Sequence, residues 1–343
     1  MTETSQKTGQ GISSPANRAS MTHRERVQAA LKGAAVDRPP VSFWLHFPGE
    51  DHTAQLLADS TVRLQQRFDL DVVKLMPTGM YAVVDYGVTI SPSTDGLGTT
   101  QYASGPVHGP HDWARLPSAP ADRGELGKQV EVVRRVRAAV DSDTPIIQTI
   151  YSPLSLASKL VGSELTPDLL DAEELPAALE RIAADVVAFA QACRGAGADG
   201  FFFASQLANA SFSRDEYERL GVPYDLTVLE ALRPDTWFLL LHLHGEEPFF
   251  DLANRYPVDA VSWEDRETTP AMGDAVSLTS RCLVGGMGRH VPLVDGTSAA
   301  VMAEAQRAMA ETRGHGLILA PGCTIPVAVP AENLQALRDS VGP

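Results

Sequence analysis

The sequence predicts an α/β fold, a (β/α)8 barrel built as a single domain. Three observations lead to this prediction: eight apolar runs of strand length, helical patterns between them, and no glycine-rich phosphate-binding fingerprint after the first run. The runs are continuously apolar rather than alternating, as parallel strands buried on both faces are. The missing fingerprint disfavours a doubly wound open sheet, which is the competing arrangement of alternating strands and helices.

The eight expected strands are spread over the whole chain. They cover residues 41–46, 71–77, 145–151, 200–205, 236–245, 259–265, 282–287 and 316–323. Between them, a helical pattern spans residues 175–197, and glycines near its end supply a stop signal. Another spans residues 297–314, where Thr297 or Ser298 can serve as the N-cap.

Two segments fall outside this pattern. From Gly79 to Arg123, after the second expected strand, the chain is irregular and rich in glycine and proline, and we expect a long excursion over the barrel mouth rather than a second domain. Residues 1–20 are polar and lack an apolar segment, so we expect a disordered tail there and not a secretory signal. The barrel domain is then expected over residues 21–343.

Composition excludes several kinds of partner. The net charge of −15 argues against nucleic acid and anionic membrane surfaces. No apolar run approaches the roughly 20 residues of a membrane span. Cys193, Cys282 and Cys323 are too few and too scattered for a disulfide framework, which indicates a reducing, cytoplasmic setting.

The stretch LLLHLHGEEPFF places two histidines at the end of the fifth expected strand. In a strand, His242 and His244 point to the same face. Cys323, in APGCTIP, follows the last expected strand, and imidazole and thiolate are good ligands for zinc and iron(II). We therefore expect these three side chains to hold one divalent metal ion, Fe(II) or Zn(II). Two hydrogen-bonded core histidines remain the alternative, and Cys193 and Cys282 are expected to be packing residues.

Polar residues at other strand ends extend the expected site, because a barrel places its chemistry at the carboxyl ends of its strands. These residues are His46, Lys74, Gln206, Glu264 and Asp265. Each one alone has a simpler structural interpretation, but their convergence on one mouth favours a pocket for a small-molecule substrate. We expect them to bind or act on that substrate rather than the metal. A carboxylate ligand from Glu264 or Asp265 is left open.

Several segments resemble the uroporphyrinogen decarboxylase superfamily, which includes the cobalamin-linked methyltransferases. The resemblance runs from about Met21 to the C-terminus. It rests on MTHRERVQAALKGAAVDRPPVSFW, YSPLSLASKLVG, AGADGFFFAS, LHLHG, DAVSWED and GLILAPGCTIPVAVPAENLQAL. It implies a (β/α)8 barrel. In the methyltransferase branch a His-x-Cys pair and a later cysteine hold zinc, and here His242 and Cys323 match, whereas His244 stands in the place of the first cysteine.

Two departures from the family pattern bear on function. The decarboxylase branch holds substrate carboxylates with arginines after its first strand, but VSFWLHFPGEDH has His46 and His52 and no arginine. Porphyrinogen decarboxylation is therefore the least expected activity. At His244, a neutral imidazole in place of a thiolate makes the metal more Lewis-acidic and less electron-rich, which weakens the inference of methyl transfer.

Two hypotheses of function follow. The first is a mononuclear non-haem iron(II) enzyme that acts oxidatively on a small organic substrate, since two histidines and one anionic ligand resemble oxygen-activating iron sites. The second, implied by the resemblance, is zinc-dependent methyl or alkyl transfer to a thiol, with a corrinoid protein as partner. We place the iron hypothesis slightly ahead. A non-catalytic binding barrel ranks third, because open ligand sets usually serve chemistry.

Overall fold

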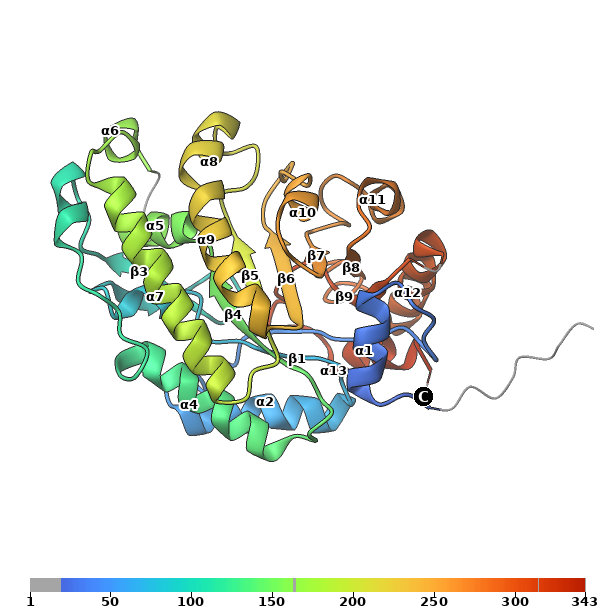
Figure 1. Cartoon of the computed structure of the whole chain (residues 1–343). Coiled ribbons are helices and arrows are strands. Elements are labelled where there is room, and N and C mark those ends of the chain that lie inside the picture. Colours follow the sequence, from blue (N-terminus) through green and yellow to red (C-terminus); the bar gives the residue numbers. More distant parts are fainter. Residues whose placement is uncertain (1–19, 163–164, 314, 343) are drawn as a thin grey trace, which may run out of the picture.

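The computed structural model describes residues 20–162, 165–313 and 315–342, so the predicted tail lies outside the described residues except for its last one. A parallel sheet curls around the centre with helices on its outer side, and the predicted barrel class is confirmed (Figure 1). The sheet order is β1-β4-β5-β6-β7-β8-β9. These strands are Val73–Leu75, Ile146–Tyr151, Gly200–Ser205, Phe238–Leu243, Ala260–Ser262, Cys282–Met287 and Leu317–Pro321.

The helices alternate with the strands, as the fold requires. They are α1 His23–Leu31, α2 Ala54–Phe68, α3 Tyr81–Val84, α4 Gly124–Ala139, α5 Pro153–Val161, α6 Pro167–Leu170, α7 Leu175–Gly195, α8 Arg214–Leu220, α9 Val222–Leu232, α10 Leu252–Arg255, α11 Met272–Leu278, α12 Ser298–Thr312 and α13 Ala331–Asp339, with 3₁₀ turns at η1 Pro110–Arg115 and η2 Arg233–Asp235. None of the helices in the described part of the chain is long and apolar enough to cross a membrane. Both helices predicted from the sequence are present, and Thr297 is the N-cap of α12.

The first expected strand, residues 41–46, is reduced to one parallel bridge between Val41 and Leu319. The amide of Ser42 donates to Leu319 over 3.0 Å, and the amide of Asp71 donates to Val41 over 2.9 Å, so this segment lies between β9 and β1 and closes the barrel. A longer ladder cannot form toward its start, because Pro39 and Pro40 have no N–H to donate.

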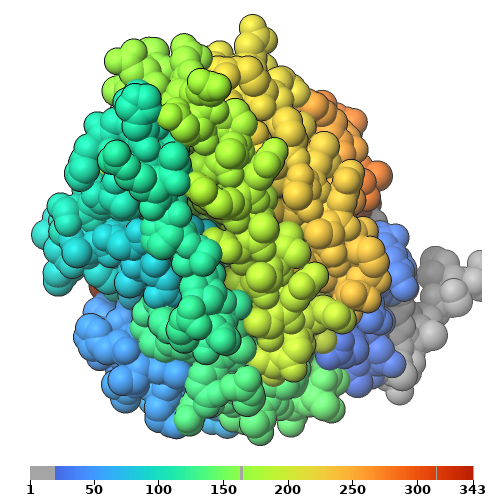
Figure 2. Space-filling view, turned by 60° about the vertical axis from the view of Figure 1, so that its left-hand side comes forward, coloured from blue at the N-terminus to red at the C-terminus, as the bar shows by residue number. Residues whose placement is uncertain are grey.

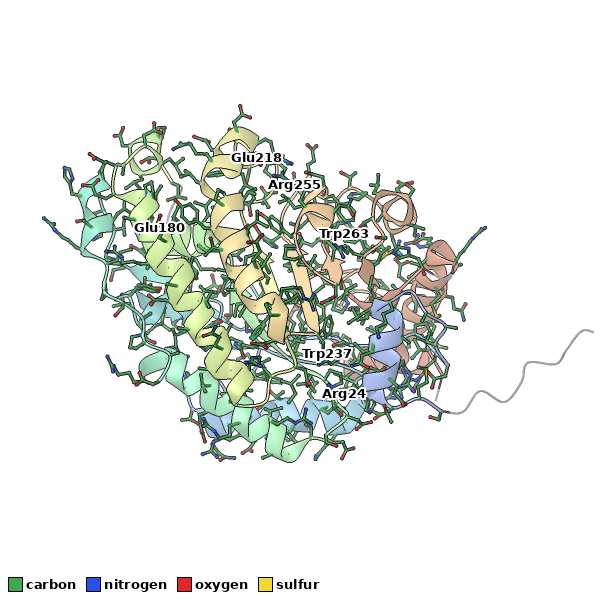
Figure 3. All side chains as sticks on the ribbon, in the orientation of Figure 1. Arg24, Glu180, Glu218, Trp237, Arg255 and Trp263 are labelled. Atoms are coloured by element: carbon green, nitrogen blue, oxygen red, sulfur yellow. The ribbon has the colours of Figure 1, made fainter. Side chains whose placement is uncertain are left out.

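A buried ion cluster stabilises this closure. The Asp71 carboxylate has no exposed surface; it accepts from the amide of Val41 over 2.8 Å and pairs with Arg26 and Arg38 at 2.6 Å each. Nearby, Arg24 of α1 lies over the ring of Trp237 at 5.2 Å, and Figure 3 shows both at the same end of the barrel. Helix α1 therefore covers the end opposite the strand carboxyl termini.

The excursion from Gly79 to Arg123 is more regular than the sequence predicts. Its strands β2 (Thr89–Pro92) and β3 (Thr100–Ser104) form an antiparallel hairpin. Figure 2 shows this part of the chain, in cyan and teal, packed beside the light green region of α5 to α7. The tip of the hairpin is fixed by a bond from the Val327 amide to the Gly96 carbonyl, 3.1 Å long. Because Val327 follows β9, the hairpin lies over the barrel mouth, as expected.

Candidate metal centre

Strand β6 carries two histidines at its carboxyl end. His242 is buried within the strand, and His244 follows it with 38% of its side chain exposed. The backbone stays extended here, because the amide of His244 donates to the Ser205 carbonyl of β5 over 3.0 Å. Both rings therefore lie on one side of the strand, with centroids 6.1 Å apart.

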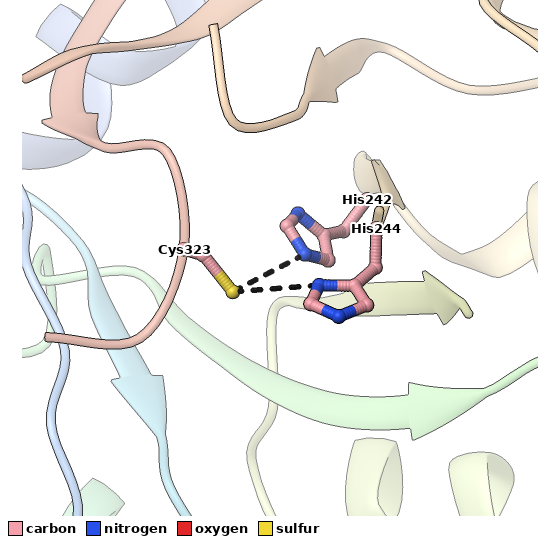
Figure 4. Close-up of side chains that lie close together, drawn as sticks. All are labelled: His242, His244 and Cys323. Atoms are coloured by element: carbon pink, nitrogen blue, oxygen red, sulfur yellow. Dashed lines mark hydrogen bonds between the residues drawn. The ribbon is translucent and has the colours of Figure 1, made fainter. Parts of the chain in front are cut away.

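Cys323 brings a thiol to the two rings from the loop after β9. Its Sγ lies 3.8 Å from Nε2 of His242 and 3.8 Å from Nδ1 of His244 (Figure 4). The three ligand atoms lie within 4.8 Å of one another. Within residues 20–162, 165–313 and 315–342, no other group of three His, Cys, Asp or Glu side chains comes together in this way.

This spacing fits a metal ion. Zinc binds nitrogen at about 2.1 Å and sulfur at about 2.3 Å, so two ligands of a tetrahedral ion lie about 3.6 Å apart. Both N···S distances, at 3.8 Å, are close to that value. Three protein ligands also leave a coordination position for a substrate, which is the pattern of catalytic rather than structural sites.

The protonation states suit metal binding as well. Desolvation lowers the pKa of His242 well below its usual value, and nearby cationic groups lower it further. Desolvation also lowers the pKa of His244. Both imidazoles are therefore neutral, which is the form that binds metal. Burial raises the pKa of the Cys323 thiol to about 11, so its proton is retained at neutral pH and would be released on metal binding.

Two neighbours orient the ring of His242. The hydroxyl of Ser262, in β7, lies 2.8 Å from Nδ1, and the ring of Phe202 stacks against the imidazole with the centroids 4.8 Å apart. Because Nδ1 is engaged by the hydroxyl, Nε2 is the nitrogen directed at Cys323.

The two acidic residues expected in the pocket differ in orientation. Glu264 lies beside the candidate metal ligands, with Oε2 4.0 Å from Nδ1 of His244 and Oε1 2.7 Å from Nη2 of Arg289. Asp265 points away from the cavity, where it accepts from the Gly286 amide over 3.0 Å and lies 3.3 Å from Nε of Arg266. Of the two carboxylates, Glu264 is therefore the one placed to contact a metal ion held by His242, His244 and Cys323. The structure does not bring Asp265 to these residues.

A cavity of about 260 Å³ adjoins His242, His244 and Cys323, and His46, Lys74 and Gln206 line it. His46 is buried, which lowers the pKa of its imidazole to about 4. Lys74 is also buried; its Nζ lies 4.2 Å from the centroid of the Phe202 ring, and desolvation lowers its pKa to about 7. The sequence thus identified three side chains of this cavity, and their roles remain predictions.

Two cationic residues of the cavity were missed in the sequence, Lys159 and Arg289. Lys159 lies in α5 and Arg289 in the loop after β8, so neither stands directly at a strand end. A lysine inside the apolar segment PLSLASKLV was the one available signal for Lys159. The other two cysteines, Cys193 and Cys282, are buried in the hydrophobic core away from this cavity.

Comparisons with known proteins identify the family of the chain. The profile of the family described as uroporphyrinogen decarboxylase (URO-D) matches residues 22–342. Among curated proteins, the methylcobamide:CoM methyltransferase MtaA of Methanosarcina barkeri is 25% identical over 337 residues, which cover 92% of this chain and 96% of that protein. MtbA of Methanosarcina acetivorans, with the same activity in its name, is 27% identical over 229 residues, or 66% of each chain.

Among solved structures, a methyltransferase from Methanosarcina mazei superimposes with a TM-score of 0.79 at 23% sequence identity. The match covers 93% of this chain and 98% of the other. At this level of identity the likeness bears on the fold alone, and it agrees with the barrel described above.

Proposed function

The chain belongs to the uroporphyrinogen decarboxylase family, and on that premise we propose that it is a metal-dependent methyltransferase that moves a methyl group from a corrinoid to a thiol. The arrangement of His242, His244 and Cys323 around one point carries the proposal. It is supported by relatives named as methylcobamide:CoM methyltransferases that align over most of their length. The oxidative iron hypothesis, placed first from the sequence, receives no support from these comparisons.

The residues present suggest how the acceptor would be activated. A zinc ion held by the three ligands would supply the Lewis acidity that favours the thiolate form of a bound thiol. Lys74, with a pKa of about 7, is the cavity group best suited to take the thiol proton on Nζ. Phe202 and Trp44, which also line the cavity, exclude water from the nucleophile.

The reaction is balanced without an oxidant. The thiolate sulfur attacks the methyl carbon, an S–C bond forms, and the Co–C bond breaks with both electrons left on cobalt. The thiol proton passes to the protein. A corrinoid protein is the proposed methyl donor, and Glu264 is the proposed source of a fourth ligand that an incoming thiol would displace.

The test is anaerobic methyl transfer from methylcobalamin to a panel of thiols by zinc-loaded protein. We expect the absorption of methylcobalamin to be replaced by that of the demethylated corrinoid, together with a thioether product. Metal-free protein and the Cys323→Ser variant serve as matched controls. A zinc-loaded protein that leaves methylcobalamin unchanged with every thiol would contradict the proposal.

A further inference from the structure

A glutamate–arginine ion pair lies at the edge of the candidate metal centre. Oε1 of Glu264 lies 2.7 Å from Nη2 of Arg289, and Oε2 of the same carboxylate lies 4.0 Å from Nδ1 of His244. This ring nitrogen is also the one that faces Sγ of Cys323, at 3.8 Å. The carboxylate therefore has one oxygen beside the arginine and the other beside the candidate metal ligands.

The position of Oε2 is just outside the distance of a metal ligand. A nitrogen and an oxygen bound to the same tetrahedral zinc ion lie about 3.4 Å apart. Oε2 is 4.0 Å from the nitrogen of His244, and Glu264 is not in the group whose ligand atoms lie within 4.8 Å of one another. A small rotation of the side chain would bring Oε2 to the ion and draw Oε1 away from Arg289. Glu264 thus stands between two partners.

The backbone fixes both residues, whereas their side chains are joined less firmly. The amide of Val294 donates to the His290 carbonyl over 2.8 Å and closes the turn after Arg289, and the amide of Thr268 donates to the Glu264 carbonyl over 2.8 Å. The ion pair joins one nitrogen to one oxygen rather than two to two, and Oε1 has no hydrogen-bond partner among the described residues. It is therefore easier to break than a bidentate pair.

Burial makes a partner for the carboxylate necessary. Only 9% of the Glu264 side chain and 17% of the Arg289 side chain are exposed. A carboxylate that leaves a metal ion in such a place needs another partner, because a buried charge without one is strongly disfavoured. In the described part of the chain, Arg289 is the one arginine or lysine that forms an ion pair with Glu264.

We propose that Arg289 is a positioning residue that receives the Glu264 carboxylate when a thiol takes the place of this carboxylate at the metal ligands. With no thiol bound, Glu264 turns toward His244 and Cys323 and fills the open coordination position. When a thiol enters, the carboxylate moves to Arg289, where it lies in this structure. Arg289 thereby sets the thiol affinity of the site through Glu264. The inference rests on the proposed function, because it takes a thiol to be the group that displaces Glu264.

Thiol binding to protein loaded with cobalt(II) instead of zinc tests the role of Arg289. A sulfur ligand gives cobalt(II) a charge-transfer absorption in the near ultraviolet, and 2-mercaptoethanol is the probe because it carries no charge to pair with an arginine. We expect Arg289→Met to weaken its binding about 10-fold or more, since the displaced carboxylate has no partner. Cobalt affinity, measured by chelator competition, should be retained or increased. Equal thiol affinity in Arg289→Met and wild type would refute the proposal.

Two further arginine variants complete this test. Arg289→Lys keeps the positive charge and should recover part of the lost thiol affinity. Arg115→Met removes an arginine whose side chain is 79% exposed, and it should match wild type. In turnover, Arg289→Met should raise the KM for the thiol and change kcat less, whereas a general loss of folding would lower metal content and kcat together.

The neutral variant Glu264→Gln tests the same relationship from the other side and does not depend on the folding of Arg289→Met. An amide competes poorly with a thiol for the ion, so Glu264→Gln should bind 2-mercaptoethanol more tightly than wild type does. Adding Arg289→Met to Glu264→Gln should then have little further effect. Additive effects of the two changes would show that the residues act separately and would contradict the inference.

A charged thiol and the corrinoid assay separate the remaining possibilities. If Arg289 instead bound an acidic group of the thiol, Arg289→Met would weaken 3-mercaptopropionate and leave 2-mercaptoethanol unchanged, and the proposal would be wrong. If 2-mercaptoethanol follows the expected pattern but methylcobalamin is not demethylated, the role of Arg289 is upheld and the methyl-transfer proposal fails. If methyl transfer proceeds with the same KM for the thiol in wild type and Arg289→Met, methyl transfer is upheld and the role of Arg289 fails.

Discussion

The hydroxyl of Ser262 lies 2.8 Å from Nδ1 of His242, and the opposite nitrogen of that ring, Nε2, lies 3.8 Å from Sγ of Cys323. Nδ1 is thus held by a hydrogen bond, and Nε2 faces the candidate metal site. A ligating histidine is commonly held this way, because the partner of its second nitrogen fixes both tautomer and orientation.

We therefore expect Ser262→Ala to weaken metal binding by about 10–100-fold, the usual effect of removing such a partner. Chelator competition on purified protein measures it. Ser262→Thr keeps the hydroxyl and should retain most of the affinity. Unchanged affinity in Ser262→Ala would show that packing against Phe202 alone orients the ring.

Removing a metal ligand should have a larger effect. His242→Ala and His244→Ala should each lower metal content and activity together, since each loses one of three protein ligands. Cys323→Ser should shift selectivity toward harder ions, because a hydroxyl replaces a thiolate poorly. Cys193→Ser and Cys282→Ser are the matched controls and should retain full metal content, because both residues are buried in the core. The ligand set would be wrong if all three cysteine variants behaved alike.

The variant His244→Cys separates zinc from iron chemistry. It creates the His-x-Cys pair of the methyltransferase branch and adds a thiolate that makes bound zinc more electron-rich. On the methyl-transfer proposal, activity with zinc should be kept or increased, and no oxygen should be consumed. An iron(II)-loaded wild-type protein that consumes oxygen with its substrate, and is inhibited by zinc, would restore the oxidative hypothesis.

Acid should weaken the closure of the barrel through Asp71. Although burial opposes it, the bonds from His23 and the charge of Arg38 lower the pKa of this carboxyl to about 2. A depressed pKa stabilises the fold at pH values above the unfolded pKa of about 3.9, and the contribution is lost as pH falls toward 2. Its size is about 2–3 kcal/mol for a shift of about two units. Urea unfolding of wild type at pH 3 should show about half of this loss relative to pH 6, because pH 3 lies midway between the two pKa values. Asp71→Asn should already be destabilised at pH 6, whereas Asp168→Asn, at an exposed position, should match wild type.

The sequence could single out the three candidate metal ligands, which the structure brings together, because strand ends are the simplest part of this fold to locate. The run that becomes β6 is apolar up to His242, so the polar residues that follow mark the barrel mouth. Two-residue periodicity then places His242 and His244 on one side. That periodicity holds only within a strand. Because β7 ends at Ser262, it does not predict the direction of Asp265, and the following turn directs this side chain toward Gly286 instead of the cavity.

Other features depend on contacts between distant segments, which a single sequence does not show. Residues 41–46 are apolar enough for a strand, but the prolines before them and the bonds to Asp71 limit the pairing to Val41. Lys159 reaches the cavity from a helix, and its position beside Tyr151 and Met80 is set by packing between segments far apart in the sequence.

The tip of the β2–β3 hairpin approaches its neighbours at Gly98, which has φ +69° and no room for a side chain. A β-carbon there would lie 2.4 Å from Pro48 and 2.7 Å from Val327, on the loops after the first and last strand positions of the barrel. Any other residue at this position would lift the tip, and with it Leu97 and Thr99, which line the cavity. The size limit for molecules entering the cavity, and the access of bulk solvent to His242, His244 and Cys323, therefore depend on a residue that does not itself line the cavity.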